Sequence, residues 1–329
     1  VGESLPKYDS IRLAKGEAPY VADLKFEGML HGALKFSDHP RAKILKIDSS
    51  KAEKIPGVLK IFTAKDIPEQ RYTGLIVEDW PLMISVGETT RYIGDVLAGI
   101  VAENEKIARQ AVDLIEVEYE VLTPITDPLK ALDSKSPKLH NGGNLLSNTE
   151  INRGDSIKAE KDSAFVTKGT YKTQRIEHAF LELECCIAKP WKGGIEIFSQ
   201  SQGVYEDRNS ISKILGIPKE QVKVILMPNG GGFGGKEDIS VQGHAALFAH
   251  LLQAPVRVAL TRPESLCMHP KRHPMNMEMS LGCDKNGKLT FVRANIIGDT
   301  GAYASVGMKV LERAAGHATS VYSIPIVNI

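Results

Sequence analysis

The sequence predicts an α+β fold, in which strands and helices are mixed along the chain. A chain of 329 residues is long enough for two domains with a substantial buried core. The segment 127–148 is rich in Pro, Gly, Ser and Asn, and strand and helix patterns resume after it. We therefore expect a first domain over residues 1–126, a linker over 127–148 and a second domain over 149–329.

In the first domain, residues 28–36 (GMLHGALKF) read as a strand, and residues 49–58 (SSKAEKIPGV) as a short helix stopped by its Pro-Gly pair. Residues 106–122 give the clearest pattern. Their apolar side chains first recur at helical spacing, up to Ile115, and then alternate with glutamates. This change of period predicts a helix followed by a strand with one face in solvent.

In the second domain, the same patterns predict further strands, helices and a hairpin. The strands are 195–202, 222–227 and 255–260, the helices are 205–216 and 239–253, and the hairpin is 275–297 with a Lys-Asn-Gly turn.

The composition gives no reason to expect nucleic acid or a membrane as partner. Lys and Arg total 41 and Asp and Glu total 40, so no strong net charge is available for either partner. No apolar run approaches the ~20 residues of a membrane span, and no basic-then-apolar leader precedes the first domain. The four cysteines include the adjacent pair Cys185 and Cys186, which does not suggest a disulfide framework. We expect a cytoplasmic protein with reduced thiols.

One spacing of metal-ligand residues occurs, in Cys267, His269 and His273, which read C-x-H-x-x-x-H. A zinc site needs a fourth ligand, and none is apparent nearby. We expect no metal held directly by side chains of this chain.

The stretch PNGGGFGGKED, residues 228–238, lies between a predicted strand and a predicted helix. Gly230, Gly232 and Gly235 fit the G-x-G-x-x-G pattern of a dinucleotide-binding loop. Two observations count against that interpretation: the next strand does not end in the expected acid, and charged residues separate the last glycine from the helix.

Two other interpretations of this stretch remain. The first is a tight turn whose glycines let a strand and a helix pack closely. A tight turn alone, however, does not need Phe233. The second is a backbone that meets a large cofactor, since glycine permits positive φ and close approach, and successive N–H groups can hold an anion.

The segment GGGFGGKE resembles the loop of the molybdenum hydroxylases, the xanthine dehydrogenase and aldehyde oxidase family. The segments KGEAPYVADL and YIGDVLAGIVAENEKIARQAVDLIEVEYEVLTPITDP are similar to the opening and the end of that family's α/β hammerhead domain. The segments RIEHAFLELECCIA, SQSQG, KRHPM, GDTGAYAS and ERA follow in the family's order. The resemblance implies a hammerhead domain over residues 1–126 and the first part of a molybdopterin-binding domain over 149–329.

By this resemblance, four residues are expected to contact the cofactor. Gln202 matches a glutamine that approaches the ligands of the molybdenum, and the loop residues Gly232, Phe233 and Gly234 match main chain that lies against the pterin. From the residues alone, Gln202 could equally be an amide at the edge of a sheet.

The resemblance also implies catalytic roles for Gln202, Glu237 and Arg313. Glu237 matches a glutamate that faces the substrate in purine-oxidising members, and Arg313 matches an arginine that polarises the substrate. Each has a simpler reading: Glu237 as an acid near a helix N-terminus, and Arg313 as a surface charge.

The implied reaction is hydroxylation of an N-heteroaromatic substrate, purine-like or nicotinate-like, with water as the oxygen source. The implied cofactor is molybdenum-molybdopterin, in the cytosine dinucleotide form used by multi-subunit bacterial members. Iron–sulfur clusters and FAD would lie on partner subunits, because the chain has no cysteine spacing for clusters and no convincing flavin motif.

The family's A-[FY]-R-G loop and its glutamate general base come later than any segment of this chain. We therefore expect a second molybdopterin-binding chain that carries the base, so that the large subunit is split, or else a fragment of a longer subunit. The alternatives are an aldehyde oxidoreductase of the same family, a nicotinamide-dependent dehydrogenase and a non-catalytic scaffold subunit. Glu237 and Arg313 favour an anionic or oxo-substituted heterocycle over an aldehyde.

Overall fold

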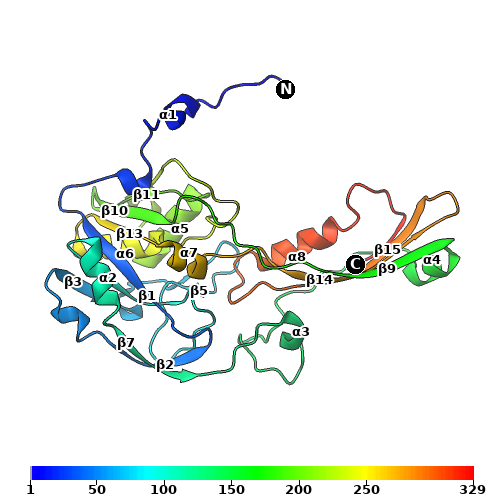
Figure 1. The fold of residues 1–329 in the computed structure, drawn as a ribbon, viewed down its shortest axis with the longest axis horizontal. Helices are drawn as coiled ribbons and strands as arrows, with labels where there is room; N and C mark the ends of the chain where they lie inside the picture. The colour runs from blue at the N-terminus through cyan, green and yellow to red at the C-terminus, as the bar shows by residue number, and fades with distance from the viewer. Residues whose placement is uncertain (1) are drawn as a thin grey trace. The chain divides into compact units, whose positions relative to one another are not determined.

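The computed structural model describes residues 2–329, which form two compact units (Figure 1). The first unit contains the chain up to residue 75 together with residues 80–122 and 178–270, and the second contains residues 76–79, 123–177 and 271–329. Among the described residues, no helix is both long enough and apolar enough to cross a membrane. The domain boundaries 1–126, 127–148 and 149–329 stay a prediction.

A seven-stranded mixed sheet forms the centre of the first unit, in the order β12-β11-β10-β13-β1-β6-β3. Its strands are β1 (Leu30–Phe36), β3 (Val58–Phe62), β6 (Val96–Ala102), β10 (Cys185–Trp191), β11 (Gly194–Ser199), β12 (Val222–Leu226) and β13 (Val256–Ala259). The parallel pair β1–β13, with Leu30 opposite Val256, joins strands from distant parts of the sequence. One sheet therefore combines the first part of the chain with residues that follow the predicted linker.

Helices cover both faces of this sheet. The helices of the first unit are α1 (Ser10–Ala14), α2 (Glu105–Val112), α5 (Val204–Leu215), α6 (Gln242–Leu252) and α7 (Arg262–Met268). In β6, Val101 belongs to a hydrophobic cluster that also contains residues 245–249 of α6. The next residue, Ala102, packs with Ala108 of α2 instead. Because successive side chains of a strand point to opposite faces, α6 and α2 lie on opposite sides. This explains why all of β6 is buried.

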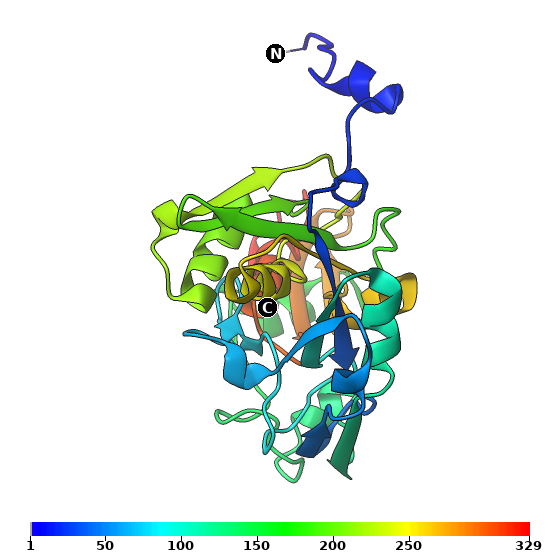
Figure 2. The same ribbon diagram turned by 90° about the vertical axis from the view of Figure 1, so that its left-hand side faces the viewer.

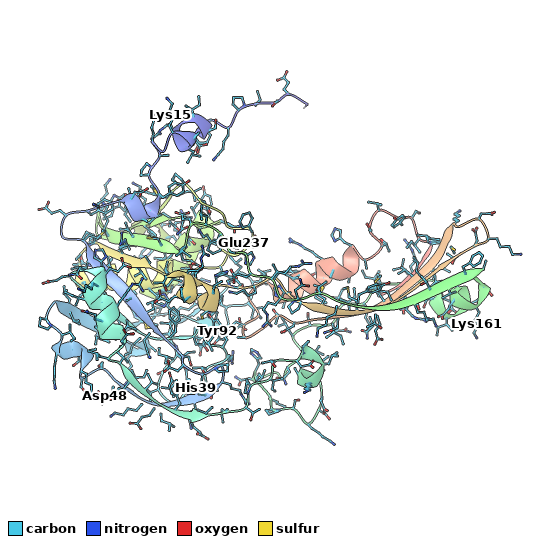
Figure 3. The ribbon with its side chains drawn as sticks, in the orientation of Figure 1. Lys15, His39, Asp48, Tyr92, Lys161 and Glu237 are labelled. Atoms are coloured by element: carbon cyan, nitrogen blue, oxygen red, sulfur yellow. The ribbon has the colours of Figure 1, made fainter. Side chains whose placement is uncertain are left out.

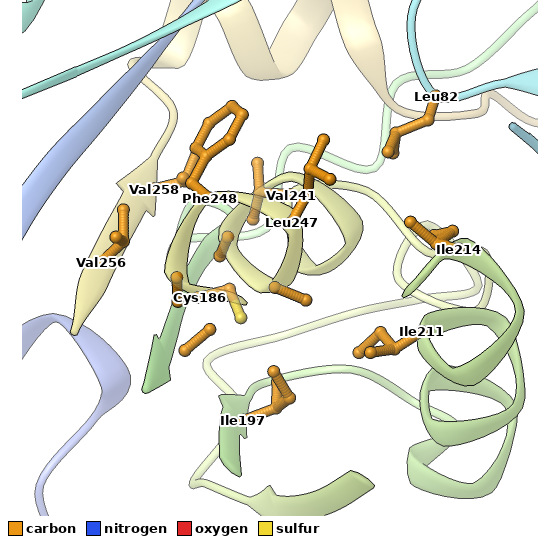
Figure 4. Close-up of a cluster of buried hydrophobic side chains, with 14 of the residues drawn as sticks. Leu82, Cys186, Ile197, Ile211, Ile214, Val241, Leu247, Phe248, Val256 and Val258 are labelled. Carbon is orange, nitrogen blue, oxygen red and sulfur yellow. The ribbon is translucent and has the colours of Figure 1, made fainter. Parts of the chain in front are cut away.

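The largest hydrophobic cluster surrounds α6, which is buried along most of its length. Phe248 of α6 stacks on Phe62 of β3 with ring centroids 4.6 Å apart. Figure 4 shows Phe248 and Leu247 of α6 with Val256 and Val258 of β13 beside them, and Figure 2 shows α6 in yellow beside the green strands. The core thus includes residues from both parts of the chain that build the sheet.

Smaller elements complete the first unit. They are the antiparallel pair β2 (Ala42–Asp48) and β7 (Glu116–Val121), the pair β4 (Tyr72–Thr73) and β5 (Trp80–Pro81), and the 3₁₀ helices Val21–Asp23, Ala52–Lys54, Ala64–Asp66 and Lys219–Gln221. The predicted short helix over 49–58 is a single 3₁₀ turn, Ala52–Lys54. The Pro-Gly pair follows too soon for a full α-helical turn to add hydrogen bonds.

The second unit is built on a five-stranded sheet in the order β8-β16-β15-β14-β9. Its strands are β8 (Asn152–Arg153), β9 (Phe165–Lys172), β14 (Met275–Cys283), β15 (Leu289–Gly298) and β16 (Ile326–Asn328), and its helices are α3 (Pro128–Ala131), α4 (Ser156–Asp162) and α8 (Gly307–Gly316). Strands β14 and β15 confirm the predicted hairpin. In its turn, the N–H of Gly287 donates to the carbonyl oxygen of Asp284.

Candidate functional site

The glycine-rich stretch 228–238 connects β12 to α6, as predicted, and is a well-defined bend rather than a helix start. Gly231 has φ +108°, Phe233 +51° and Gly234 +86°. The helix begins only at Gln242, whose side-chain oxygen accepts a hydrogen bond from the N–H of Ser240 at 2.8 Å. The loop is therefore separate from the helix that follows it.

Two of the loop glycines, Gly230 and Gly235, make room for side chains of residues 178–182. A Cβ on Gly230 would lie 2.5 Å from Cβ of Glu182, and one on Gly235 would lie 3.0 Å from Nδ1 of His178 and 3.1 Å from Cε1 of Phe180. The first contact would require the backbone or Glu182 to shift, and the contacts at Gly235 would require small shifts of both rings. These two glycines are therefore explained by packing on residues 178–182, which belong to neither a strand nor a helix.

Gly232 makes room for Gln202, which fastens the loop. A Cβ at Gly232 would lie 2.4 Å from Oε1 of Gln202. That oxygen accepts hydrogen bonds from the N–H of Gly234 at 3.0 Å and of Lys236 at 3.3 Å. The N–H of Gln202 donates to the carbonyl oxygen of Lys236 at 2.9 Å. Gln202 and the loop thus form one hydrogen-bonded structure, with the glutamine side chain at the surface.

The position of Gln202 differs slightly from the expected strand end. Strand β11 stops at Ser199, because the hydroxyls of Ser199 and Ser201 both turn toward Asp207 of α5. They donate to Oδ2 of Asp207 at 2.8 and 2.6 Å. Asp207 is 1% exposed, and its burial raises the pKa of the carboxyl to about 6 despite these bonds. Gln202 therefore lies in the turn between β11 and α5.

Phe233 is the most unusual residue of the loop. It has a left-handed backbone, which costs a residue other than glycine about 1 kcal/mol, and its side chain is 72% exposed. Its neighbour Gly234 also has positive φ, and a Cβ there would meet nothing within 4 Å. A strained backbone that holds a large apolar ring in solvent is typical of a ligand-contacting position.

Three successive peptide groups of the loop have no partner in residues 2–329. None of the hydrogen bonds of this part of the chain uses the N–H of Gly231, Gly232 or Phe233. Buried backbone N–H groups are nearly always paired, and Gly232 is buried. Consecutive free N–H groups with alternating φ form a concavity that suits an anion.

The remaining predicted residues are placed as follows. Glu237 is exposed beside the loop, and no described residue donates to its carboxylate; Figure 3 labels it among the side chains of the first unit. Arg313 is exposed on α8 of the second unit, where its carbonyl oxygen accepts from the N–H of His317 at 3.0 Å. The structure brings Gln202 together with Gly232 and Gly234, whereas Arg313 belongs to another unit.

Two residues that fix the loop by hydrogen bonds, Lys236 and Arg262, were not predicted from the sequence. Lys236 is buried, and its Nζ donates to the carbonyl oxygen of Glu182 at 2.8 Å. Arg262 of α7 donates to the carbonyl oxygen of Phe180 at 2.6 Å. A lysine directly after the last glycine of the loop was the one available signal, because a buried lysine needs specific partners.

The sheet topology does not support a nicotinamide-binding site at this loop. A dinucleotide fingerprint joins neighbouring parallel strands through its helix. Here β12 is an edge strand, and α6 leads to β13, which pairs with β10 and β1 instead. The G-x-G-x-x-G match is therefore not a Rossmann motif.

Comparisons with known proteins agree over nearly the whole chain. Residues 15–123 match the family described as aldehyde oxidase and xanthine dehydrogenase, a/b hammerhead domain, and residues 139–329 match the molybdopterin cofactor-binding domain. A probable xanthine dehydrogenase subunit of Bacillus subtilis is 38% identical over 95% of this chain and 42% of the relative. The nicotinate dehydrogenase large molybdopterin subunit of Eubacterium barkeri is 34% identical over 100% of this chain and 77% of the relative.

Solved structures show the same fold. The aldehyde oxidoreductase of Desulfovibrio gigas gives a TM-score of 0.94 at 24% identity, over 99% of this chain and 38% of that chain. Quinoline 2-oxidoreductase of Pseudomonas putida gives 0.90 at 28% identity, over 100% of this chain and 43% of that chain. The chain thus spans less than half the length of these two proteins and of the Bacillus relative. It belongs to the aldehyde oxidase and xanthine dehydrogenase family, with that family's α/β hammerhead domain over residues 15–123 and its molybdopterin cofactor-binding domain over residues 139–329.

Proposed function

We propose that the glycine-rich loop and Gln202 hold one side of a molybdenum-molybdopterin cofactor in a hydroxylase. The observation that carries this proposal is the conformation of the loop: an exposed Phe233 on a left-handed backbone, next to unpaired N–H groups. These groups fit an organic cofactor that is anionic and flat, because the amides supply donors and the ring supplies an apolar face.

The chain's own residues would act by binding and orientation. The oxygen of the Gln202 amide is held by the loop, which leaves its NH₂ group to donate to a ligand. Gly232, Phe233 and Gly234 would present main chain to the cofactor. The cofactor would supply the redox chemistry and the activation of water.

Glu237 and Arg313 are proposed to act on the substrate. The Glu237 carboxylate would accept a hydrogen bond from a ring N–H, and the Arg313 guanidinium would stabilise negative charge that develops on the substrate. Both side chains are exposed and therefore available to a ligand.

The proposed substrate is an N-heteroaromatic compound that is hydroxylated with oxygen from water. The names of the relatives support this class: xanthine and nicotinate dehydrogenases by sequence, and quinoline 2-oxidoreductase by structure. An aldehyde is the alternative within the family, and the Desulfovibrio gigas enzyme shares the fold.

The proposed assembly contains further chains. A second molybdopterin-binding chain would carry the catalytic base, and separate subunits would carry the iron–sulfur clusters and FAD. The Bacillus and Eubacterium relatives are both named as subunits of dehydrogenases, which supports a multi-subunit enzyme. We also propose the cytosine dinucleotide form of the cofactor. A cytoplasmic location is proposed as well, and the four free cysteines support it.

The test begins with metal analysis of the complex purified from its native source. About one molybdenum per copy of this chain is expected, with no stoichiometric NAD. The complex is then assayed with xanthine, nicotinate and benzaldehyde in isotopically labelled water, and the label is expected in the heteroaromatic product. Absence of molybdenum contradicts the proposed cofactor, whereas turnover of benzaldehyde alone contradicts only the substrate class.

A further inference from the structure

Lys236 is buried beneath the loop, although lysine is almost never fully buried without partners. The residue is 3% exposed. Its ammonium group lies 4.4 Å from the ring centroid of Phe180 and 3.6 Å from a carboxylate oxygen of Glu182. Burial lowers the pKa of Lys236, and the neighbouring glutamates oppose that change.

The acceptors around the ammonium group require a donor at this position. Nζ donates to the carbonyl oxygen of Glu182 at 2.8 Å and to the side-chain oxygen of Gln200. Gln200 is itself fixed, because its Nε2 donates to the carbonyl oxygens of Leu183 and Cys185. An apolar side chain in place of Lys236 would leave two buried acceptors unpaired.

The same residue also joins the loop to Gln202 through its backbone. Its N–H donates to Oε1 of Gln202, and its carbonyl oxygen accepts from the N–H of Gln202. Lys236 therefore connects three segments: the glycine-rich loop, residues 200–202, and residues 180–182.

We propose that Lys236 is a positioning residue, whose buried charge holds Gln202 and the free peptide groups of the loop in place for an anionic part of the cofactor. This inference rests on the proposed function. A cation in a low-dielectric environment acts over several ångströms, and it adds to the partial positive charge of the N–H groups at Gly231, Gly232 and Phe233.

The test uses the purified complex with Lys236→Met, which keeps the length of the side chain and removes its charge. Molybdenum content after dialysis is expected to fall about tenfold or more, and the electron paramagnetic resonance spectrum of the remaining molybdenum is expected to change. Lys236→Arg, which keeps the charge, should recover part of both. Lys223→Met is the control variant. Lys223 of β12 forms an ion pair with Glu196 of β11, outside the loop, so loss of its charge should leave the molybdenum content unchanged.

A second variant keeps the inference testable if Lys236→Met does not fold. Glu182→Gln keeps an acceptor for the N–H of Gly230 and removes the negative charge beside the ammonium group. The reduction potential of the molybdenum, measured at pH 8, should become more positive, because the site gains net positive charge. An unchanged potential would show that charge beside the ammonium group does not act on the molybdenum, which contradicts an electrostatic role for Lys236.

The outcomes separate this inference from the proposed function. A wild-type complex without molybdenum overturns both. A wild-type complex with molybdenum, together with a Lys236→Met variant of normal metal content and spectrum, overturns only the role of Lys236. An unchanged reduction potential of the molybdenum in Glu182→Gln would also overturn only the role of Lys236.

Discussion

At the scale of single residues, neighbouring glycines of the loop are required for different reasons. The space beside Gly232 is filled by the amide of Gln202, whereas Gly234 has open space and a positive φ. Gly232 is therefore needed to leave space for the side chain of Gln202. Gly234 is needed because its backbone has a positive φ. Substitutions at the two positions should separate cofactor binding from stability.

We expect Gly232→Ala to reduce molybdenum content strongly with little loss of stability, because the new methyl group displaces Oε1 of Gln202 from its hydrogen bonds. Gly234→Ala should lower the free energy of unfolding by about 1 kcal/mol through backbone strain. Urea denaturation and metal analysis of both variants measure the two effects. A Gly232→Ala variant with wild-type metal content would show that Gln202 is not needed at its present position.

Asp207 gives a prediction for the pH dependence of stability. Its pKa is about 6 in the folded protein and its ordinary value is 3.8, so the folded state binds this proton more tightly. The contribution to stability is present below about pH 4 and is lost as the pH rises through about 6. Between pH 4.5 and 7.5, wild type should lose about 2 kcal/mol of unfolding free energy relative to Asp207→Asn.

Urea denaturation of both proteins at these two pH values measures that difference. Comparing the same two proteins cancels the contributions of other titrating groups. An equal difference at both pH values would mean that Asp207 titrates normally, and that its hydrogen bonds to Ser199 and Ser201 offset its burial.

At the scale of elements, the short helix α7 supports the loop from a distance. Its N-cap Thr261 forms a capping box with Glu264, and Glu264 also accepts both hydrogen bonds from Nη1 of Arg109 in α2 at 3.1 Å. Arg262, which follows Thr261, donates a hydrogen bond to the carbonyl oxygen of Phe180. Gly235 of the loop packs against the ring of that phenylalanine. The cap of α7 is thus connected to the candidate site through Arg262.

Thr261→Ala should lower the free energy of unfolding by about 1 kcal/mol, because the cap hydrogen bonds are lost. Thr261→Ser keeps the hydroxyl group and should stay close to wild type. Thermal unfolding of both variants under one condition provides the measurement. If the two variants destabilise equally, the methyl group of the threonine matters and the cap does not.

Elements with strong local patterns were predictable from the sequence. Helix α2 and strand β7 follow the change of period between residues 107 and 121, and the β14–β15 hairpin follows its Lys-Asn-Gly turn. Gln202 and Phe233 could be proposed as cofactor contacts because they lie in short motifs that resemble those of the family. Phe180 and Glu182 could not, because no spacing within the loop indicates which distant segment fills the space beside a glycine.

At the scale of the whole molecule, the two regions that match different family domains share one sheet in the first unit. Strands β1, β3 and β6 come from the hammerhead region, and β10 to β13 from the molybdopterin-binding region. The sequence could not predict this pairing, since the interacting strands are separated by most of the chain. Phe62 and Phe248, which stack in the core, also come from the two regions.

We expect a fragment of residues 1–126 not to fold alone, because β1 would lack β13 and Phe62 would lack Phe248. Circular dichroism and thermal denaturation should show no cooperative transition for this fragment. Co-expression with residues 127–329 should restore a complex that can be purified. A cooperative transition in the isolated fragment would establish the hammerhead region as an independent folding unit.

The pairing of Leu30 with Val256 also has a consequence for synthesis on the ribosome. One side of β1 remains without its neighbour until β13 has left the exit tunnel, and exposed strand edges promote intermolecular association. Non-local pairing of this kind slows folding. The nascent polypeptide should therefore depend on chaperones that bind early, and slower translation of residues 123–260 should increase its aggregation.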